Sequence, residues 1–153
     1  MKLEKKIVST NRKAFHDFEI LETVEAGIVL AGYEVKSLRK GDVNLTDGFV
    51  GFRNNEAFLE NIHIAPYAQL STHVQDYNSR QRRKLLLHKS EIVRLYHKTR
   101  EKGLVIVPLE IFFSERGIAK VKLGLAKGKR LADKRETLKR RDIERETRRE
   151  MSK

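Results

Sequence analysis

The chain contains no cysteine among its 153 residues. This absence excludes disulfide bonds, thiol catalysis and zinc-ribbon RNA binding, and it is compatible with a reducing compartment. Long apolar runs are missing as well, because none approaches the roughly 20 residues that span a membrane. The N-terminal stretch MKLEKKIVSTNRK lacks the apolar segment of a secretory signal. We therefore expect a cytoplasmic protein with no membrane partner.

Recognisable catalytic and metal-binding patterns are also absent. The histidines show no i,i+4 pair and no HExxH motif, which predicts no metal site; they are His16, His63, His73, His88 and His97. The stretch GLAKGKR resembles a phosphate-binding loop, but it is one residue short between its glycines and lacks the final Ser or Thr. No nucleophile triad or paired carboxylate stands out. The sequence predicts a protein that is not an enzyme and holds no cofactor or metal.

Basic residues dominate the composition. Lys and Arg number 33 against 21 Asp and Glu, which gives a net charge of +12 and a pI near 10.0. Such an excess is typical of proteins that bind nucleic acid. Residues 127–153 carry 12 basic and six acidic side chains but few large apolar ones. This segment cannot build a core, so we predict a folded domain at 1–126 and a basic tail at 127–153.

Alternation of apolar and polar residues predicts that the folded domain is mainly β. Residues 15–27 are predicted to form a strand, and residues 46–64 a hairpin that turns at Asn54 and Asn55. Residues 84–88 are a further strand candidate. Residues 103–113 and 119–126 predict a second hairpin across Ser114–Gly117, with Pro108 marking an edge or a bulge. In the last strand alternate residues face the core, namely Ala119, Val121, Leu123 and Leu125.

Two helices are predicted between these strands. Ile28, Ala31, Val35 and Leu38 recur at helical spacing, and Gly41 stands where that helix would end. Ile92, Leu95, Tyr96 and Thr99 repeat the pattern in residues 90–103, with Ser90 as the N-cap and Gly103 at the C-terminus. About six short strands with two to three helices suggest a small closed antiparallel barrel, among which the oligonucleotide-binding (OB) fold is the natural choice.

Basic and aromatic residues cluster twice in the predicted domain. NRKAFH at 11–16 places Arg12 and Lys13 beside Phe15 and His16. YNSRQRRKLLLHK at 77–89 places Arg80, Arg82, Arg83 and Lys84 after Tyr77. Guanidinium and ammonium groups pair with phosphates, and exposed rings stack on unpaired bases. The alternative interpretation is that Phe15 is a core residue and the basic residues are a solvated rim. Two clusters together with a basic tail favour RNA.

Five blocks of the sequence resemble the SsrA-binding protein family, also called small protein B. They are AGYEVKSLRKG at 31–41, STHV at 71–74, RRKLLLHKSEI at 82–92, KVKLGLAKGKR at 120–130 and DKRETLKRRD at 133–142. The resemblance implies an OB-type barrel that binds the tRNA-like part of transfer-messenger RNA and delivers it to stalled bacterial ribosomes. It also implies indirect partners, the alanyl-tRNA synthetase and the elongation factor that carries charged tRNA.

The resemblance also implies which residues contact RNA. In the barrel these are Asn11, Arg12, Lys13, His16, Tyr33, Glu34, Lys36, Arg82, Arg83 and Lys84. In the tail, residues matching the family pattern would contact the ribosome at the decoding centre and mRNA channel of the small subunit. They are Gly128, Lys129, Arg130, Asp133, Lys134, Arg135, Lys139, Arg140 and Arg141.

The tail departs from the family pattern at one position. Many members have a histidine immediately before Asp-Lys-Arg, where this chain has Ala132, so stacking from that position is not expected here. Asp133 and Glu136 form an Asp variant of the capping box, and Glu136–Arg140 and Glu144–Arg148 are favourable i,i+4 pairs. Isolated helices of this length are marginal in water. We therefore expect the tail to be disordered when free and helical on the ribosome.

Two other classes share part of this pattern. A ribosomal or ribosome-assembly protein would have the same charge and barrel, but it would copurify with all ribosomal subunits. An RNA-modifying enzyme would show turnover on the purified RNA.

Overall fold

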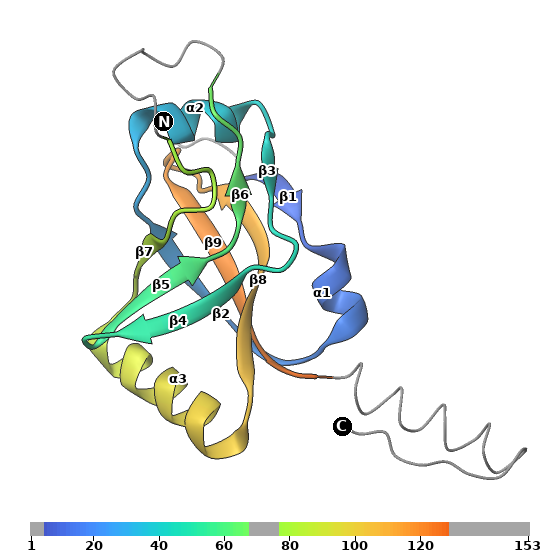
Figure 1. Ribbon diagram of the computed structural model, residues 1–153, viewed down its shortest axis with the longest axis vertical. Coiled ribbons are helices and arrows are strands. Elements are labelled where there is room, and N and C mark those ends of the chain that lie inside the picture. The colour runs from blue at the N-terminus through green and yellow to red at the C-terminus, as the bar shows by residue number, and fades with distance from the viewer. Residues whose placement is uncertain (1–4, 68–76, 129–153) are drawn as a thin grey trace, which may run out of the picture.

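The computed structural model describes residues 5–67 and 77–128, which form three helices and nine strands (Figure 1). In chain order they are β1 (Lys6–Thr10), α1 (Arg12–Asp17), β2 (Glu19–Ile28), α2 (Gly32–Arg39), β3 (Val43–Asn44), β4 (Phe49–Arg53), β5 (Glu56–Glu60), β6 (His63–Ile64), β7 (Arg83–Leu86), α3 (Lys89–Lys102), β8 (Val105–Phe113) and β9 (Ala119–Lys127). The mainly β class is confirmed, with nine strands in the described residues instead of about six.

The strands form an open antiparallel sheet rather than the closed barrel expected from the sequence. Its order is β1-β8-β9-β2-β7-β5-β4, and β3 and β6 pair separately. Within the described ranges β1 and β4 remain the two edges, so the prediction of a closed barrel is wrong. The β character could be inferred from the alternation, but closure depends on whether the first and last strands pair, which no local pattern encodes.

Both predicted hairpins are confirmed. Asn54 and Asn55 have φ of 52° and 64°, the left-handed values that a tight two-residue turn requires, and β4 pairs with β5 in register across them. β8 pairs with β9 along their whole lengths. The register shifts between Pro108 and Glu110, so Pro108 marks a bulge, and β8 is an interior strand flanked by β1 and β9.

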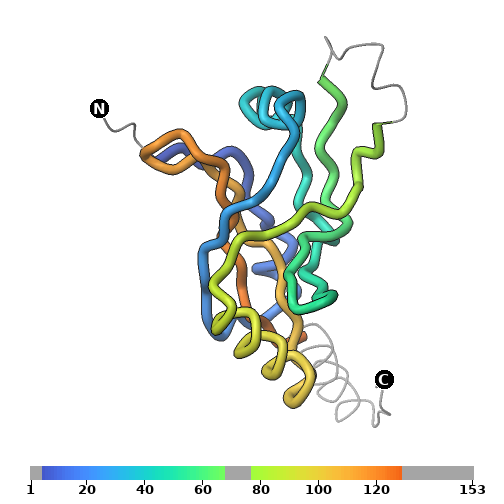
Figure 2. Tube along the Cα trace, turned by 90° about the vertical axis from the view of Figure 1, so that its left-hand side faces the viewer, coloured from blue at the N-terminus to red at the C-terminus, as the bar shows by residue number. Residues whose placement is uncertain are grey.

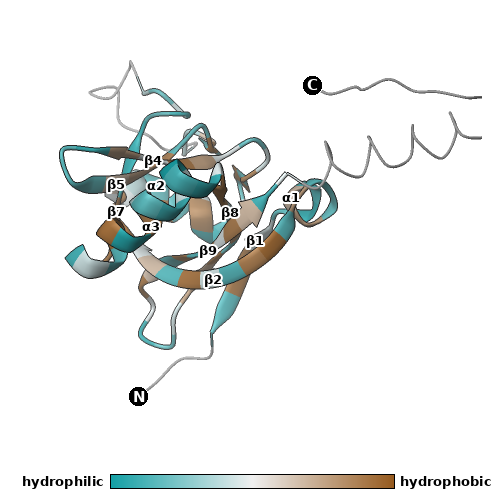
Figure 3. Cartoon of the chain, turned by 90° about the horizontal axis from the view of Figure 1, so that it is seen from below, coloured by the Kyte–Doolittle hydropathy of each residue, from teal (hydrophilic) through white to brown (hydrophobic). Residues whose placement is uncertain are grey.

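The sheet buries residues on both faces near β8 and β9. The larger cluster includes Leu59, Leu85, Val121 and Leu123, and the predicted inward face of the last strand is confirmed. A smaller cluster on the other side joins Ala14 of α1 to Val107, Leu109 and Ala126. The ribbon of β2 shows the corresponding alternation of hydrophobic and hydrophilic residues (Figure 3).

Helix α1 corrects the prediction of a strand over residues 15–27. The strand begins only at Glu19, because the Asn11 side chain accepts the amide hydrogen of Ala14 and starts a helical turn. The alternation at Ile20 and Val24 is real and belongs to β2, whereas Phe18 is the C-cap residue of α1. Strand β1 was not predicted, since its five residues carry little apolar signal.

The other two helices lie at opposite ends of the sheet (Figure 2). α2 begins at Gly32 rather than near Ile28, which is the last residue of β2. α3 begins at Lys89 with His88 in the N-cap position, so the prediction of Ser90 as N-cap is wrong; Glu91 accepts the His88 amide hydrogen instead. Gly103 ends α3 with φ of 64°, as predicted. Tyr96, expected in the core stripe, is 38% exposed.

Candidate nucleic-acid interface

Helix α1 presents the first predicted cluster to solvent. Arg12, Lys13 and His16 are exposed, and Phe15 is 46% exposed while Ala14 packs on the sheet. The interpretation of Phe15 as a core residue is therefore wrong. Lys13 Nζ lies 3.3 Å from the Asp47 carboxylate on the loop before β4. Cations and an exposed ring thus lie on one short helix, an arrangement that suits phosphate and base contacts.

Asn11 is only 4% exposed and holds this helix in place. Its side chain caps α1 and donates to the carbonyls of Pro108 at 2.9 Å and Leu45 at 3.3 Å. The Asn11 amide also donates to the Leu109 carbonyl at 2.8 Å, beside the bulge. The residue therefore joins α1, β8 and the segment before β4.

Replacing this residue tests that role. We expect Asn11→Ala to lower the free energy of unfolding by about 1–3 kcal/mol, because it removes the cap and two buried hydrogen bonds, those to the Pro108 and Leu45 carbonyls. Urea denaturation of both proteins measures the difference. Asn78→Ala is the control, since the hydrogen bond that the Asn78 side chain accepts from the Arg80 amide is local and exposed. Equal stability of the Asn11 variant and the wild type would contradict the assignment.

Glu34 and Arg83 form an ion pair inside the protein. Each side chain is 2% exposed, and Arg83 Nη2 lies 2.6 Å from Glu34 Oε2. The same Glu34 oxygen accepts from Arg83 Nε at 3.0 Å and from Gln81 Nε2 at 2.9 Å, and the Tyr77 hydroxyl lies 3.0 Å away. Glu34 Oε1 accepts the Ala31 amide hydrogen, which closes the first turn of α2. We call these four residues, Glu34, Tyr77, Gln81 and Arg83, the Glu34 network.

Arg83 has no unused donor direction toward solvent. Its guanidinium also donates to the carbonyls of Ile62, Ser79 and Gln81. The network therefore ties α2 to the chain before β7 and to the segment before β6. Glu34 and Arg83, expected from the family pattern to contact RNA, occupy an internal structural position.

The electrostatics of the network keep Glu34 charged. Burial acts to raise the pKa of Glu34, but hydrogen bonds from Arg83, the Ala31 amide and Gln81 outweigh it and lower that pKa below its ordinary value. Burial and the Glu34 charge raise the pKa of Tyr77 to about 12, so its hydroxyl stays protonated. An ionised carboxylate can remain here because it is fully paired.

Two cations of the second predicted cluster, Arg82 and Lys84, lie on the outer face of the sheet at β5 and β7, whereas Arg83 of that cluster is buried. Lys84 Nζ lies 2.9 Å from Glu56 Oε2, and Arg82 Nε lies 3.5 Å from Glu60 Oε1. The Arg82 guanidinium carbon is 5.6 Å from the centre of the Phe58 ring. We call these five residues, Glu56, Phe58, Glu60, Arg82 and Lys84, the β5–β7 patch.

Helix α2 adds a third group of cations and rings. Lys36 and Lys40 lie over the Tyr67 ring, at 5.5 and 5.0 Å from its centre. Tyr33 is half-buried and meets Tyr77 edge to face, with ring centres 5.4 Å apart. Tyr33 and Lys36 therefore lie among aromatic side chains at the end of the molecule where α2 sits.

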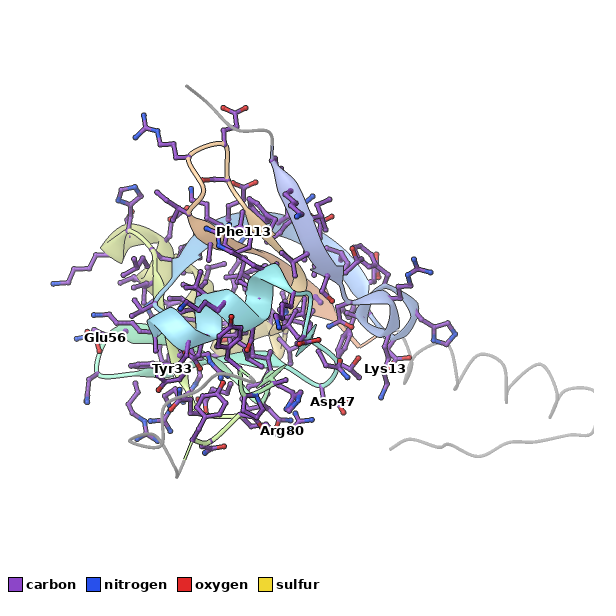
Figure 4. The ribbon with its side chains drawn as sticks, turned by 90° about the horizontal axis from the view of Figure 1, so that it is seen from above. Lys13, Tyr33, Asp47, Glu56, Arg80 and Phe113 are labelled. Carbon is purple, nitrogen blue, oxygen red and sulfur yellow. The ribbon has the colours of Figure 1, made fainter. Side chains whose placement is uncertain are left out.

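The predicted site residues do not form one continuous patch. Lys13 and Asp47 lie on one side of the molecule and Glu56 on the other, with Tyr33 and Arg80 between them (Figure 4). The structure brings Glu34 and Arg83 together, and it leaves α1 apart from the β5–β7 patch. Gly128 lines the same pocket as Asn11 and Lys13, so the tail leaves the domain beside α1. The other tail residues, from Lys129 onward, lie outside the described residues.

Sequence reasoning missed Gln81 and Tyr67, and it treated Tyr77 only as the start of a basic cluster. Gln81 and Tyr77 act through hydrogen bonds to a residue more than 40 positions away, which no local pattern could indicate. Tyr67 follows Pro66 in a segment without periodicity, so no signal pointed to it.

Residues 5–67 and 77–128 contain no group of three or more His, Asp or Glu side chains placed to hold a metal ion. No helix within them is long and apolar enough to cross a membrane.

Comparison with known proteins identifies one family. A family model described as SmpB protein matches residues 8–153. The SsrA-binding protein of Coprothermobacter proteolyticus is 52% identical over 145 residues, covering 95% of this chain and 96% of its own. That of Enterococcus faecalis is 50% identical over 143 residues, covering 94% and 91%. A chain from a solved structure described as "tmRNA-SmpB: a journey to the center of the bacterial ribosome" matches with a TM-score of 0.70 and 51% identity, covering 92% of this chain and 96% of that one.

Proposed function

This chain belongs to the SmpB family, and we propose from that membership that it binds SsrA RNA, the transfer-messenger RNA, and acts with it in trans-translation on stalled bacterial ribosomes. The observation that carries the proposal is identity above 50% to SsrA-binding proteins along almost the whole of both chains. The solved relative described with tmRNA and the bacterial ribosome supports the same partners. The place of action is the ribosome in the cytoplasm.

The surface chemistry supports RNA as the partner. Exposed cations lie beside aromatic rings on α1, on α2 and on the β5–β7 patch, and the chain carries a net charge of +12. Phosphate contacts from such groups supply affinity, while rings take unpaired bases. We propose that Arg12, Lys13, His16, Tyr33, Lys36, Arg82 and Lys84 contact the tRNA-like domain. This activity is binding and requires no catalytic residue.

The buried members of the predicted site act differently in this proposal. Asn11 positions α1, and the pair of Glu34 and Arg83 positions α2 and the segments before β6 and β7. They support the interface without touching the RNA, because their polar atoms already have partners within the protein.

The tail is proposed to act on the ribosome. Its net charge is positive, and it leaves the domain beside α1, where RNA bound to Arg12 and Lys13 would also lie. We propose that the tail residues named from the family pattern, from Gly128 to Arg141, reach the decoding centre and the mRNA channel of the small subunit. The folded domain would then stand in for the anticodon arm that the tRNA-like RNA lacks.

The test of the proposed function is the RNA that the protein retains. Sequencing the RNA copurified with the tagged, full-length chain should show strong enrichment of SsrA RNA over ribosomal RNA. Stoichiometric recovery of all ribosomal RNAs without that enrichment would instead identify a ribosomal or ribosome-assembly protein.

Salt dependence separates the proposed phosphate contacts from other residues. Removing one contact with Arg12→Ala or Lys84→Ala should reduce the slope of log affinity against log salt by about 0.7 to 0.9, because one fewer counterion is released. Titration of the purified SsrA RNA at several salt concentrations measures the slope. Arg116→Ala, in the exposed turn between β8 and β9, is the control and should leave the slope unchanged. Slopes that fall equally for all three variants would contradict specific contacts at Arg12 and Lys84.

A further inference from the structure

Phe58 lies on the outer face of the sheet and has no part in the core. Its neighbours in β5, Ala57 and Leu59, are fully buried, so Phe58 points the opposite way. It belongs to neither of the two hydrophobic clusters, although Phe52 on the adjacent strand packs against the larger one. The fold therefore gains little core packing from an aromatic ring at this position.

The residues around Phe58 are charged and partly cover its ring, which is half-buried. On β4 the directly opposite residue is Gly51, and the flexible Glu60 side chain lies over that glycine, so Glu60 must swing aside for a base to reach the ring from this side. On β7 the directly opposite residue is Lys84. Arg82 lies over the ring at 5.6 Å. The strand register thus places the ring in a row between a glycine and a lysine.

The carboxylates of this patch hold its cations. Glu56 and Glu60 stand two residues before and two residues after Phe58 on the same strand face, and they pair with Lys84 and Arg82 respectively. Both pairs are partly exposed, with 28–46% of each side chain accessible. Their net contribution to stability is therefore small. For this reason each cation can exchange its carboxylate partner for a phosphate of the RNA. Arg53, opposite Glu56 on β4, adds a third positive charge at this edge.

We propose that Phe58 is a stacking platform for an unpaired nucleobase of the bound RNA, with Lys84 and Arg82 taking the phosphates that flank that nucleotide. This inference rests on the proposed function, because it assigns one nucleotide of the SsrA RNA to this position. Stacking on an aromatic ring tolerates any base, so the site selects an unpaired nucleotide rather than a particular sequence. The two carboxylates remain beside the base and can accept hydrogen bonds from its amino group or from a ribose hydroxyl.

Substitution of Phe58 by leucine tests the stacking. Leucine keeps an apolar side chain on the strand but has no π-face, so Phe58→Leu should weaken binding to SsrA RNA by about 5- to 150-fold. The slope of log affinity against log salt should not change, because the phosphate contacts remain. The matched control is Tyr96→Leu on α3, since Tyr96 is an exposed ring with Arg100 over it at 5.6 Å but lies outside the proposed interface. It should bind like the wild type.

A tryptophan reporter decides the proposal independently of affinity. The chain has no tryptophan, so Phe58→Trp introduces a single indole whose fluorescence should be quenched when a base stacks on it. This variant should bind with nearly wild-type affinity, whereas Tyr96→Trp should show no quenching. Unquenched Phe58→Trp in the RNA complex, or wild-type affinity of Phe58→Leu, would overturn the stacking role alone. If the wild-type protein failed to bind SsrA RNA, the proposed function itself would be overturned.

Discussion

Glu34→Gln should be the most destabilising single substitution of a charged residue among those discussed, lowering the free energy of unfolding by about 3–5 kcal/mol. The variant keeps the shape of the side chain but removes its charge. Arg83 then remains buried without a counterion, since its other partners are the neutral Tyr77 hydroxyl and three carbonyls. Urea denaturation at neutral pH measures the loss.

The control for this substitution is Glu22→Gln. Glu22 also pairs with two cations, Arg94 and Lys98 of α3, but all three side chains are 30–41% exposed. Solvent screens such pairs, so the expected loss is at most about 1 kcal/mol. Similar losses of stability for the two variants would show that the buried Glu34–Arg83 pair matters no more to stability than an exposed pair.

The stability difference between the wild type and Glu34→Gln should depend on pH. The folded-state pKa of Glu34 lies below its ordinary value of 4.5, so its contribution to stability is present above that value and is lost as the pH falls through the folded-state pKa. The stability difference between wild type and Glu34→Gln should therefore be constant near neutral pH and shrink under acid conditions. A difference that stayed constant down to the acid transition would contradict the assignment. Comparison with the variant is needed because the pKa of Glu22 is lowered as well.

Removal of the tail should separate RNA binding from ribosome rescue. The cut belongs after Gly128, because Ala126 is buried and Lys127 still pairs with Glu19 in the sheet. Affinity for isolated SsrA RNA should fall by less than about tenfold, since the tail adds only nonspecific attraction to the free RNA. Peptide tagging on stalled ribosomes should be abolished, because the proposed contacts to the decoding centre are gone.

A full-length variant in which two tail charges are reversed tests the same division as the truncation. Replacing Lys129 and Arg130 together by Glu should abolish tagging while preserving the folded domain. If either variant lost SsrA RNA binding as severely as it lost tagging, the proposed division between domain and tail would be wrong.

The sequence predicts the elements of this fold better than their arrangement. The turn at Asn54 and Asn55 and the end of α3 at Gly103 depend on one or two residues with special backbone preferences, so local chemistry identifies them. Whether the sheet closes depends on the outermost strands, and β1 is too short and too polar to be detected. Helix α1 is missed because its cap, Asn11, is followed by only six helical residues.

The candidate site was predictable for its exposed members only. Exposed cations such as Arg12 and Lys84 stand in basic and aromatic clusters, and the structure leaves them at the surface. Glu34 and Arg83 match the family pattern equally well, yet they face each other across 49 residues of chain and are buried. A sequence pattern identifies that a residue is required, but it does not distinguish a contact to RNA from a contact that holds the interface in shape.

The open sheet has a consequence for the protein's behaviour in concentrated solution. An unpaired outer strand offers free amide and carbonyl groups on which another copy could add its own strand, a common start of aggregation. Here β1 limits that risk, because it has only five residues, begins at Lys6 directly after Lys5, and loses regular register between Ile7 and Ser9. Its charge and its irregular backbone oppose the long, flat pairing that self-association through this edge needs.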